Sequence, residues 1–529
     1  MIYYLSLKDE TPCKDYWDYG ILDLLDYPSE EVRSLPKVDK AIVVLPARHH
    51  AGLEDEVNGQ LRRISKVVLF LMGDEDAEFD TSKIKHGDIQ IWKQNPHKGI
   101  HDQYHKLGTG YTTKTRQILK NASHTKRKTV FFAGQITHQR REELERVLVG
   151  YKQNGGSVDF NPSKGFTQGL DHETYYRGMA SAYIAPAPSG AVIPDSFRLF
   201  EALESMAVPI ADERCANGKI YEYWDWLFGE AVPFPKVVDW DRLPSITAEI
   251  MEDYPYHQHH ITAFWLQWKY NFRHKVREQL GLPPEKVTVI IPTSVLQSHP
   301  STDIIDETIR AIRKQLPNAD IIMQIDGLRD EQLDRKKAYD RYKTEVLWKC
   351  LHEWEKVTPI LFDELHHQTD MLRATIDMVK TPMMIYVEGD APLTPDEIIE
   401  WDLCYEMIET GQANTIRFHH EAQIPHEHEG LMLGKEGKFV KTYQWSQRPH
   451  LSSVAYYKDI IIPTMPSKTF IEDGYHGVVQ NDWNRNGMMG WFKHRLWIYH
   501  PNDKNIKRSY TTDGRQGGLK YTSDDKVGL

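Results

Sequence analysis

The stretch MMIYVEGDAP, residues 383–392, ends a run of apolar side chains in two carboxylates around a glycine. The apolar run 383–387 is long enough for a buried strand, and the alanine and proline that follow Asp390 stop it. Glu388 and Asp390 therefore fall just after the carboxyl end of the predicted strand. Open α/β sheets bind ligands at this end, so the stretch predicts an α/β fold with a site at Glu388-Gly389-Asp390.

Bulk properties predict a multi-domain acidic protein. A chain of 529 residues exceeds what one hydrophobic core supports, so we expect at least two domains. A net charge of -11 gives no general attraction to nucleic acid or anionic membranes, although it leaves a local basic groove open. The four dispersed cysteines predict reduced thiols in a cytoplasmic protein. The N-terminus has no signal-peptide pattern, and no apolar run is long enough for a membrane span.

Short apolar runs alternate with charged, helix-like segments, which is typical of parallel sheets covered by helices. The alternation predicts two Rossmann-like layers at 1–125 and 126–230, a helical linker at 231–284 and a further α/β domain at 285–529. The predicted strands are 41–46, 67–72, 129–133, 182–186, 208–211, 287–292, 319–326 and 383–387. The predicted helices include 140–150, 196–206, 260–280 and 303–315.

Three acidic elements recur in the last domain. Asp326 ends one predicted strand, Glu388 and Asp390 follow another, and Glu472 and Asp473 come about 80 residues later. A carboxylate at the first position suits a ribose or base, and one after the second strand suits Mg²⁺ or Mn²⁺ beside a diphosphate. The third pair offers the general base that a transfer to a hydroxyl requires.

The order VIIP, QID, VEGD, FIEDG over about 285–500 resembles the GT-A nucleotide-sugar glycosyltransferases, especially glycosyltransferase family 2. The resemblance implies that Asp326 contacts the uracil or ribose and that Glu388-Gly389-Asp390 is the DxD-type motif, with Asp390 ligating Mn²⁺ or Mg²⁺. It also implies that Asp473 of the Glu472-Asp473 pair is the base. His500 is the candidate C-terminal metal ligand, with His494 behind it. The first element departs from the family, since it reads Pro292-Thr293-Ser294-Val295 where many members have an aromatic residue and an asparagine.

Two histidine-rich stretches invite a metal-site interpretation that we do not favour. Residues 426–429 read HEHE within a stretch bounded by proline and glycine, which indicates a solvated loop. Residues 257–260 read HQHH and are interpreted as the entrance of a helix.

The clearest motif of the first half is PDSFRLFEALESMAVPI, residues 194–210. A helix beginning near Ser196 carries Arg198 and Glu201 one turn apart, and its N-terminus offers free backbone N–H groups to a phosphate. Arg198 can bind phosphate oxygens, and Glu201 can accept hydrogen bonds from a ribose diol. The alternative is a surface ion pair between the two.

This motif resembles the donor domain of exostosin-like GT-B glycosyltransferases over about 125–215. FFAGQ at 131–135, followed by Arg140 and Arg141, resembles the strand, glycine turn and diphosphate-binding arginine of that family. The resemblance implies donor binding by Arg140, Arg141, Ser196, Arg198 and Glu201. His49-His50 and Asp74-Glu75 lie where an acceptor-side base could stand, although structural loops are the simpler interpretation.

Together these resemblances imply a tandem fold, a GT-B-like pair of Rossmann-like layers followed by a GT-A-like mixed-sheet domain. They imply an inverting glycosyltransferase that moves a sugar from a nucleotide-diphosphate sugar, such as a UDP-sugar, to a hydroxyl. The acceptor favoured here is a hydroxymethylated pyrimidine of DNA, because the chain resembles phage enzymes that modify DNA in the host cytoplasm. A bacterial surface polysaccharide is the competing acceptor.

Two segments would supply the basic groove that DNA needs. Residues 483–508 are rich in basic and aromatic side chains, and residues 116–128 are rich in basic ones. Solvated faces are the alternative, and the negative net charge favours it. The remaining hypothesis is that the chain is not an enzyme but a protein that binds nucleotide sugars or carbohydrates.

Overall fold

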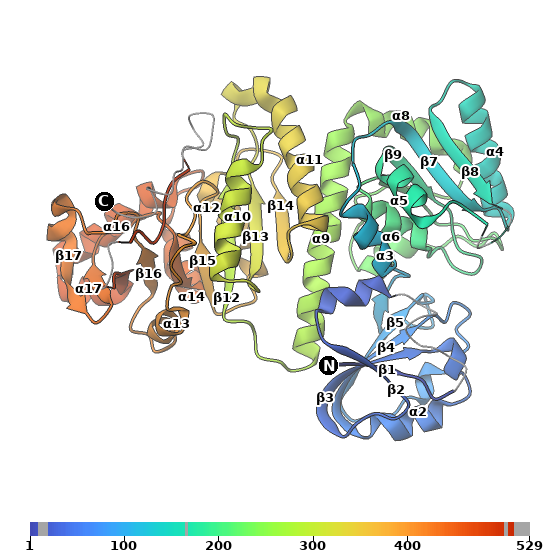
Figure 1. Cartoon of the computed structure of the whole chain (residues 1–529), viewed down its shortest axis with the longest axis horizontal. Coiled ribbons are helices and arrows are strands. Elements are labelled where there is room, and N and C mark those ends of the chain that lie inside the picture. The colour runs from blue at the N-terminus through green and yellow to red at the C-terminus, as the bar shows by residue number, and fades with distance from the viewer. Residues whose placement is uncertain (9–18, 164, 166–167, 502–505, 513–529) are drawn as a thin grey trace. The chain divides into compact units, whose positions relative to one another are not determined.

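The computed structural model describes residues 1–8, 19–163, 165, 168–501 and 506–512 (Figure 1). The chain divides into two compact units. Unit 1 holds Met1–Leu282 and Leu351–Glu353, and unit 2 holds Pro283–Cys350 and the chain from Trp354 onward. Each unit is described by itself.

The first sheet of unit 1 is parallel throughout, in the order β2-β1-β3-β4-β5-β6. Its strands are β1 (Ile2–Leu5), β2 (Ser29–Val32), β3 (Val38–Pro46), β4 (Ile64–Met72), β5 (Ile89–Gln94) and β6 (His105–Leu107). The helices of this part are α2 (Glu54–Leu61) and α3 (Thr113–Leu119). The predicted strands 41–46 and 67–72 are confirmed as parts of β3 and β4.

The second sheet of unit 1 is also parallel, in the order β11-β10-β9-β7-β8. Its strands are β7 (Lys128–Gln135), β8 (Val158–Ser163), β9 (Ala182–Ala187), β10 (Val208–Asp212) and β11 (Lys236–Val237). Its helices are α4 (Gln139–Gln153), α5 (His172–Ala180), α6 (Phe197–Glu204) and α7 (Tyr223–Phe228), followed by α8 (Leu243–Glu252) and α9 (Tyr254–Gln279). The three strands and the helices predicted for this part are present, and the HQHH stretch lies in the first turns of α9 as expected.

Unit 2 is built on a mixed sheet in the order β14-β13-β12-β15-β19-β16-β20-β18-β17. Its strands are β12 (Val287–Thr293), β13 (Asp320–Ile325), β14 (Val357–Leu361), β15 (Met383–Tyr386), β16 (Thr415–Phe418), β17 (Met432–Glu436), β18 (Phe439–Thr442), β19 (His450–Ser453) and β20 (Leu496–Tyr499). Strands β12 to β15 are parallel, and β19 runs antiparallel between β15 and β16. The fold-class prediction of two Rossmann-like sheets and a mixed sheet is therefore confirmed.

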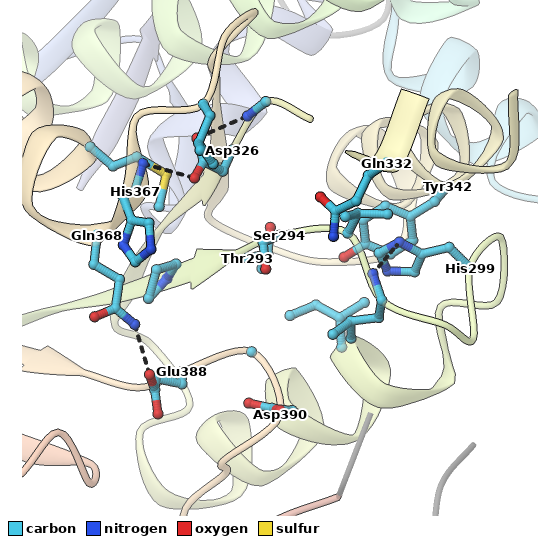
Figure 2. A pocket seen from close by; sticks show the side chains of 18 of the residues that line it. Thr293, Ser294, His299, Asp326, Gln332, Tyr342, His367, Gln368, Glu388 and Asp390 are labelled. Carbon is cyan, nitrogen blue, oxygen red and sulfur yellow. Dashed lines mark hydrogen bonds between the residues drawn. The ribbon is translucent and has the colours of Figure 1, made fainter. Parts of the chain in front are cut away.

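Eight helices of unit 2 are described. They are α10 (Asp303–Gln315), α11 (Lys336–His352), α12 (His367–Thr375), α13 (Trp401–Glu409), α14 (Val454–Tyr456), α15 (Ile462–Thr464), α16 (Ile471–Asn486) and α17 (Met488–His494). The loops that follow β12, β13 and β15 meet the first turn of α12, and this edge of the sheet carries the site (Figure 2). The HEHE stretch falls in a 3₁₀ turn, His426–Leu431, with no buried residue, as the loop interpretation expected.

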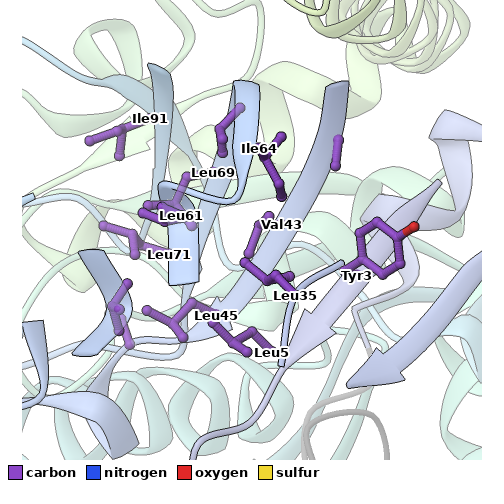
Figure 3. Packing of buried hydrophobic residues seen from close by; sticks show 14 of the residues in the cluster. Tyr3, Leu5, Leu35, Val43, Leu45, Leu61, Ile64, Leu69, Leu71 and Ile91 are labelled. Carbon is purple, nitrogen blue, oxygen red and sulfur yellow. The ribbon is translucent and has the colours of Figure 1, made fainter. Parts of the chain in front are cut away.

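The core of the first sheet shows why two of its strands, β3 and β4, were predicted from the sequence. Val43, Leu45, Leu69 and Leu71 of β3 and β4 are fully buried and pack against Leu61 of α2 (Figure 3). A parallel strand covered on both faces needs a continuous apolar run, and that run is the sequence signal.

The cysteines and the apolar content of the helices are described for the residues given above. Cys215, Cys350 and Cys404 are buried free thiols, while Cys13 lies outside the described residues. Within the described part of the chain, no helix combines the length and hydropathy needed to cross a bilayer.

Candidate functional site

A cavity of about 350 Å³ opens at the carboxyl edge of β12, β13 and β15. Asp326, Glu388 and Asp390 all line it (Figure 2). The backbone ladder continues past the strand ends, since the N–H of Asp326 donates to Thr293 O at 3.0 Å and that of Gly389 to Pro292 O at 3.2 Å. The acidic residues after two separate strands therefore share one pocket.

The backbone of Gly389 packs closely against the end of β12. A Cβ at this position would lie 3.1 Å from Thr293 Cγ2 and 3.4 Å from Pro292 O. The side chain of Thr308 also donates to Gly389 O at 2.8 Å, which fixes the turn between Glu388 and Asp390. Asp390 is held from the other side, because its carbonyl accepts the N–H of Thr512 at 2.9 Å.

The Asp326 carboxylate caps the start of α12. One oxygen accepts the N–H groups of Gly327 at 2.9 Å and His366 at 2.8 Å, and the other accepts the N–H of His367 at 2.9 Å. Only 3% of Asp326 is exposed. Asp326 thus fixes the first turn of α12 against the strand edge, and the lone pairs that remain are what it offers a ligand.

His367 adopts a left-handed backbone conformation with φ of +60°, which is unusual for a non-glycine residue. Its ring lies edge-on to Phe470, with the centroids 4.2 Å apart, and both residues line the cavity. Such strain costs about 1–3 kcal/mol and persists where surrounding contacts impose it, as the hydrogen bond to Asp326 does here.

Gln368 joins two of the acidic elements. Its amide nitrogen donates to Glu388 Oε1 at 2.7 Å, and its amide oxygen accepts the N–H of Ile471, the first residue of α16, at 3.4 Å. The next residues of α12 hold the segment before α16: Thr469 N donates to Thr369 Oγ1 at 3.2 Å, and Lys468 N to Asp370 Oδ2 at 3.0 Å. The first turns of α12 therefore connect Asp326, Glu388 and the start of α16.

Burial is the main reason why the pKa of Glu388 rises to about 7, and the neighbouring Asp390 carboxylate adds to the rise. The hydrogen bond from Gln368 acts in the opposite direction, because it stabilises the ionised form. Glu388 and Asp390 repel each other at the wall of the pocket, and a divalent cation bound between them would relieve that repulsion.

The two carboxylates fit Mg²⁺ or Mn²⁺ only in partnership with a ligand. In the described residues, no group of three or more His, Cys, Asp or Glu side chains is arranged to hold a metal ion. Mg²⁺ is commonly held by one or two carboxylates, with substrate phosphates and water completing its shell. Glu388 and Asp390 match that requirement when a diphosphate is present.

The Glu472-Asp473 pair lies in the first turn of α16. Glu472 is half-buried and raises the pKa of Glu388 through its charge, and it also interacts with Arg417. Asp473 is exposed to solvent. Neither residue is among those that line the cavity, although Phe470, which precedes them, is.

The C-terminal histidines have other surroundings. His500 follows β20, and burial together with the charges of Lys435 and Arg508 lowers its pKa. Positive charges near a side chain oppose the binding of a metal ion there. The surroundings of His500 therefore do not favour its predicted role as a metal ligand, which stays a prediction. His494 is buried and bonded to Tyr456 Oη at 2.8 Å and Asp482 at 2.9 Å.

In unit 1, the predicted arginines Arg140 and Arg141 have different surroundings. Arg140 is buried and paired with Asp212 through two hydrogen bonds, at 2.7 and 3.1 Å, so it braces β10 against α4. Arg141 donates to Gln135 O at 3.1 Å, and burial together with the charge of Arg198 lowers its pKa to about 10.

The remaining predicted residues of unit 1 cluster beside Arg141. The Arg198 guanidinium bonds to Ala133 O and lies 4.7 Å from the centre of the Phe132 ring. Glu201, three residues along α6, accepts the hydroxyls of Tyr175 at 2.7 Å and Tyr176 at 3.0 Å. Ser196 precedes the helix as its N-cap residue, and its hydroxyl makes no cap hydrogen bond.

The candidate bases of unit 1 also separate. Asp74 is fully buried in an ion pair with Lys93 at 2.6 Å, and the ring of His50 bonds to Leu7 N at 3.0 Å and Pro46 O at 2.9 Å. Glu75 is the one that interacts with Arg141, and burial raises its pKa. Asp74 and His50 are thus structural, His49 is half-buried, and Glu75 is the candidate beside the arginine cluster.

Reasoning from sequence missed His367, Gln368 and Phe470. The first two stand in HHQTD, residues 366–370, which contains no strand or phosphate-loop signal. Phe470 directly precedes the IEDG stretch, and its place beside that motif was the one available signal.

Comparisons with known proteins give partial likenesses. No protein-family model matches the chain, and no curated protein matches it. A fragment of S. aureus TarS in complex with UDP-GlcNAc matches over 43% of this chain and 58% of its own length, at 12% identity and a TM-score of 0.28. The mannosyltransferase PcManGT from Pyrobaculum calidifontis, in complex with GDP-Man and Mn²⁺, matches over 46% and 66%, at 13% identity and a TM-score of 0.26. At these values the likenesses carry no conclusion about function.

Proposed function

We propose that unit 2 is a glycosyltransferase domain that binds a nucleotide-diphosphate sugar, with a divalent cation at Glu388 and Asp390. The observation that carries the proposal is the meeting of Asp326, Glu388 and Asp390 in one cavity of about 350 Å³ at the carboxyl edge of parallel strands. That size lies in the range of small-molecule sites, and that edge is where α/β sheets bind nucleotides.

The donor would lie with its nucleoside toward Asp326 and its diphosphate toward Glu388 and Asp390. When bound, Mg²⁺ or Mn²⁺ would neutralise the charge that develops on the leaving diphosphate. Gln368 keeps Glu388 in place and favours its ionised form, which is the form that holds a cation.

Transfer would proceed by direct displacement. The acceptor oxygen forms a bond to the anomeric carbon while the bond from that carbon to the diphosphate breaks, and the acceptor proton passes to Asp473. Attack opposite the leaving group inverts the anomeric carbon. Glu472, whose charge acts on Glu388 and Arg417, would position this first turn of α16.

A saccharide acceptor fits the described surface better than DNA. Of the aromatic side chains in 483–508, Trp491 and Trp497 are only 4% and 3% exposed, so these two cannot stack on bases, whereas Phe492 is 49% exposed. In the other segment, Lys126 is bonded to Ala180 O at 3.0 Å and Met206 O at 2.8 Å. We therefore propose a saccharide, such as a surface polysaccharide, and keep hydroxymethylated DNA as an outcome of the test.

Unit 1 supports a second candidate function, the binding of a nucleotide or another diphosphate-bearing ligand. Arg141 and Arg198 lie close enough for one charge to lower the pKa of the other, and such a pair favours an anion between them. Whether unit 1 also transfers a sugar depends on Glu75, the candidate base beside Arg141.

The test is a turnover assay on the full chain. Purified protein with Mn²⁺ is given a panel of UDP-, GDP- and TDP-sugars with saccharides, with DNA containing hydroxymethylated pyrimidines, or with neither. We expect release of one nucleoside diphosphate and a hexose or pentose mass increment on a saccharide. An increment on the modified base would instead establish a DNA acceptor. Binding of a sugar nucleotide without any turnover would establish a non-catalytic binding protein.

A further inference from the structure

Phe470 is an exposed aromatic side chain at the mouth of the unit 2 cavity. It is 43% exposed and lines the cavity together with His367, Gln368 and Glu388. Other large apolar side chains of the described residues are as exposed, but among them Phe470 is the one that lines the cavity. The ring therefore offers an apolar surface to whatever the cavity binds.

The position of the ring is imposed by its surroundings. Its edge-on contact with His367 has a centroid distance of 4.2 Å. The backbone on either side is fixed by Thr469 N, which donates to Thr369, and by Ile471 N, which donates to Gln368. A rigid aromatic surface loses little conformational entropy on binding, which is what a binding platform requires.

The ring also stands where an acceptor must lie. Gln368 ties Glu388, beside the proposed diphosphate, to the start of α16, and Asp473 follows Phe470 by three residues. Phe470 lines the cavity and directly precedes the turn of α16 that carries Asp473, so it lies between the proposed donor site and the proposed base.

The charges around the ring indicate the chemical class of that acceptor. Glu388 and Asp390 line the same cavity, and Glu472 and Asp473 follow the ring. Arg329 lines the cavity as well, and the charge of Arg448 acts on Glu388. The carboxylates can accept hydrogen bonds from neutral hydroxyl groups, and this property favours a hydroxyl-rich acceptor.

We infer that Phe470 is the platform on which the acceptor saccharide packs, with the apolar C–H face of a pyranose on the ring and its hydroxyls toward the carboxylates. This inference rests on the proposed function. It adds a substrate-contacting residue and a neutral, hydroxyl-rich acceptor class to that site.

The test uses the full chain saturated with UDP and Mg²⁺, and saturation-transfer NMR with methyl glycosides of glucose, galactose, mannose and N-acetylglucosamine. We expect at least one glycoside to show contact through its ring C–H protons, with affinity falling about tenfold in Phe470→Ala and kept in Phe470→Tyr. The matched control is Phe492→Ala on α17, because Phe492 is 49% exposed and does not line the cavity.

The other outcomes overturn the inference in distinguishable ways. If Phe470→Ala weakens UDP binding as much as glycoside binding, the ring belongs to the donor. If no glycoside binds, or if a hydroxymethylcytosine oligonucleotide binds through Phe470 instead, the acceptor is not a saccharide at this ring. If UDP itself does not bind with Mg²⁺, the proposed function fails first.

Discussion

The side-chain amide of Gln368 donates to Glu388 at 2.7 Å while its oxygen accepts the first N–H of α16 at 3.4 Å. One buried, neutral side chain thus links the carboxylate proposed to hold the cation with the helix that carries the proposed base. Gln368 is 7% exposed, so the link is shielded from water. A hydrogen bond to a charged group is stronger in such a buried place than in water. This relationship sets the first two predictions.

Replacing Gln368 with alanine should move the acid limb of the pH–activity profile upward by about one pH unit. The lost hydrogen bond stabilises the ionised form, so the pKa of Glu388 rises above its value of about 7 and less of it is ionised at neutral pH. The measurement is kcat/KM for the donor against pH, with Gln480→Ala farther along α16 as control. An unmoved acid limb would show that Gln368 does not act on Glu388.

Replacing Glu388 with glutamine should stabilise the protein at pH 8 while it abolishes cation-dependent donor binding. The folded-state pKa of Glu388 is raised from 4.5 to about 7, so the folded state binds more protons between these values and wild-type stability falls as pH rises through them. The variant escapes that fall and should gain about 3 kcal/mol at pH 8 and nothing at pH 4. Urea unfolding at both pH values checks this, and equal gains at both would refute it.

Asp473→Asn should lower kcat by about 10²–10⁴-fold and leave the affinity for UDP with Mn²⁺ unchanged. The reason is that the proposed role of Asp473 is to accept the acceptor proton, and it has no proposed contact with the donor. Glu472→Gln, one residue earlier, should instead change the pH dependence through Glu388. Steady-state kinetics and calorimetry on both variants separate the roles. A loss of UDP affinity in Asp473→Asn would place that carboxylate at the donor.

The arginine cluster of unit 1 should bind UDP or pyrophosphate without a metal ion. In a chain carrying Asp390→Asn, with EDTA present, calorimetry should detect this binding, and Arg141→Ala or Arg198→Ala should weaken it at least tenfold. Arg177→Ala is the matched control, because Arg177 is half-exposed and paired with Glu173 at 2.9 Å. The second candidate function falls if no metal-independent binding exists.

The strands that carry the site were readable from the sequence for a physical reason. The strands β12, β13 and β15 are buried along their whole length and therefore appear as continuous apolar runs. Carboxylates directly after such runs lie at the carboxyl edge of a parallel sheet, and for this reason the sequence predicts that Asp326 and Glu388 share one edge.

The rest of the site depends on contacts between segments distant in sequence. Gln368 reaches Glu388 across 20 residues and Ile471 across 103, and no local pattern encodes either contact. Strands β16 to β20 were missed for a related reason: β17 is partly exposed, β16, β18 and β19 carry polar residues, and the apolar run of β20 is only four residues long.

The same limit explains the interpretation of residues 483–508 as a DNA surface. Composition counts aromatic and basic side chains but does not tell which of them face the core. Trp497 lies in the fully buried strand β20, and Trp491 packs against it with ring centroids 5.6 Å apart.

The central claim is that Glu388 and Asp390 hold a divalent cation against a nucleotide diphosphate. The most direct measurement is calorimetric titration of UDP, GDP and TDP into wild type and Asp390→Asn, each with Mn²⁺ and with EDTA. We expect one nucleotide to bind wild type at least tenfold more tightly with Mn²⁺ than with EDTA, and Asp390→Asn to lose that difference. A metal-dependent affinity that survives in Asp390→Asn, or no nucleotide binding with Mn²⁺, would contradict the account.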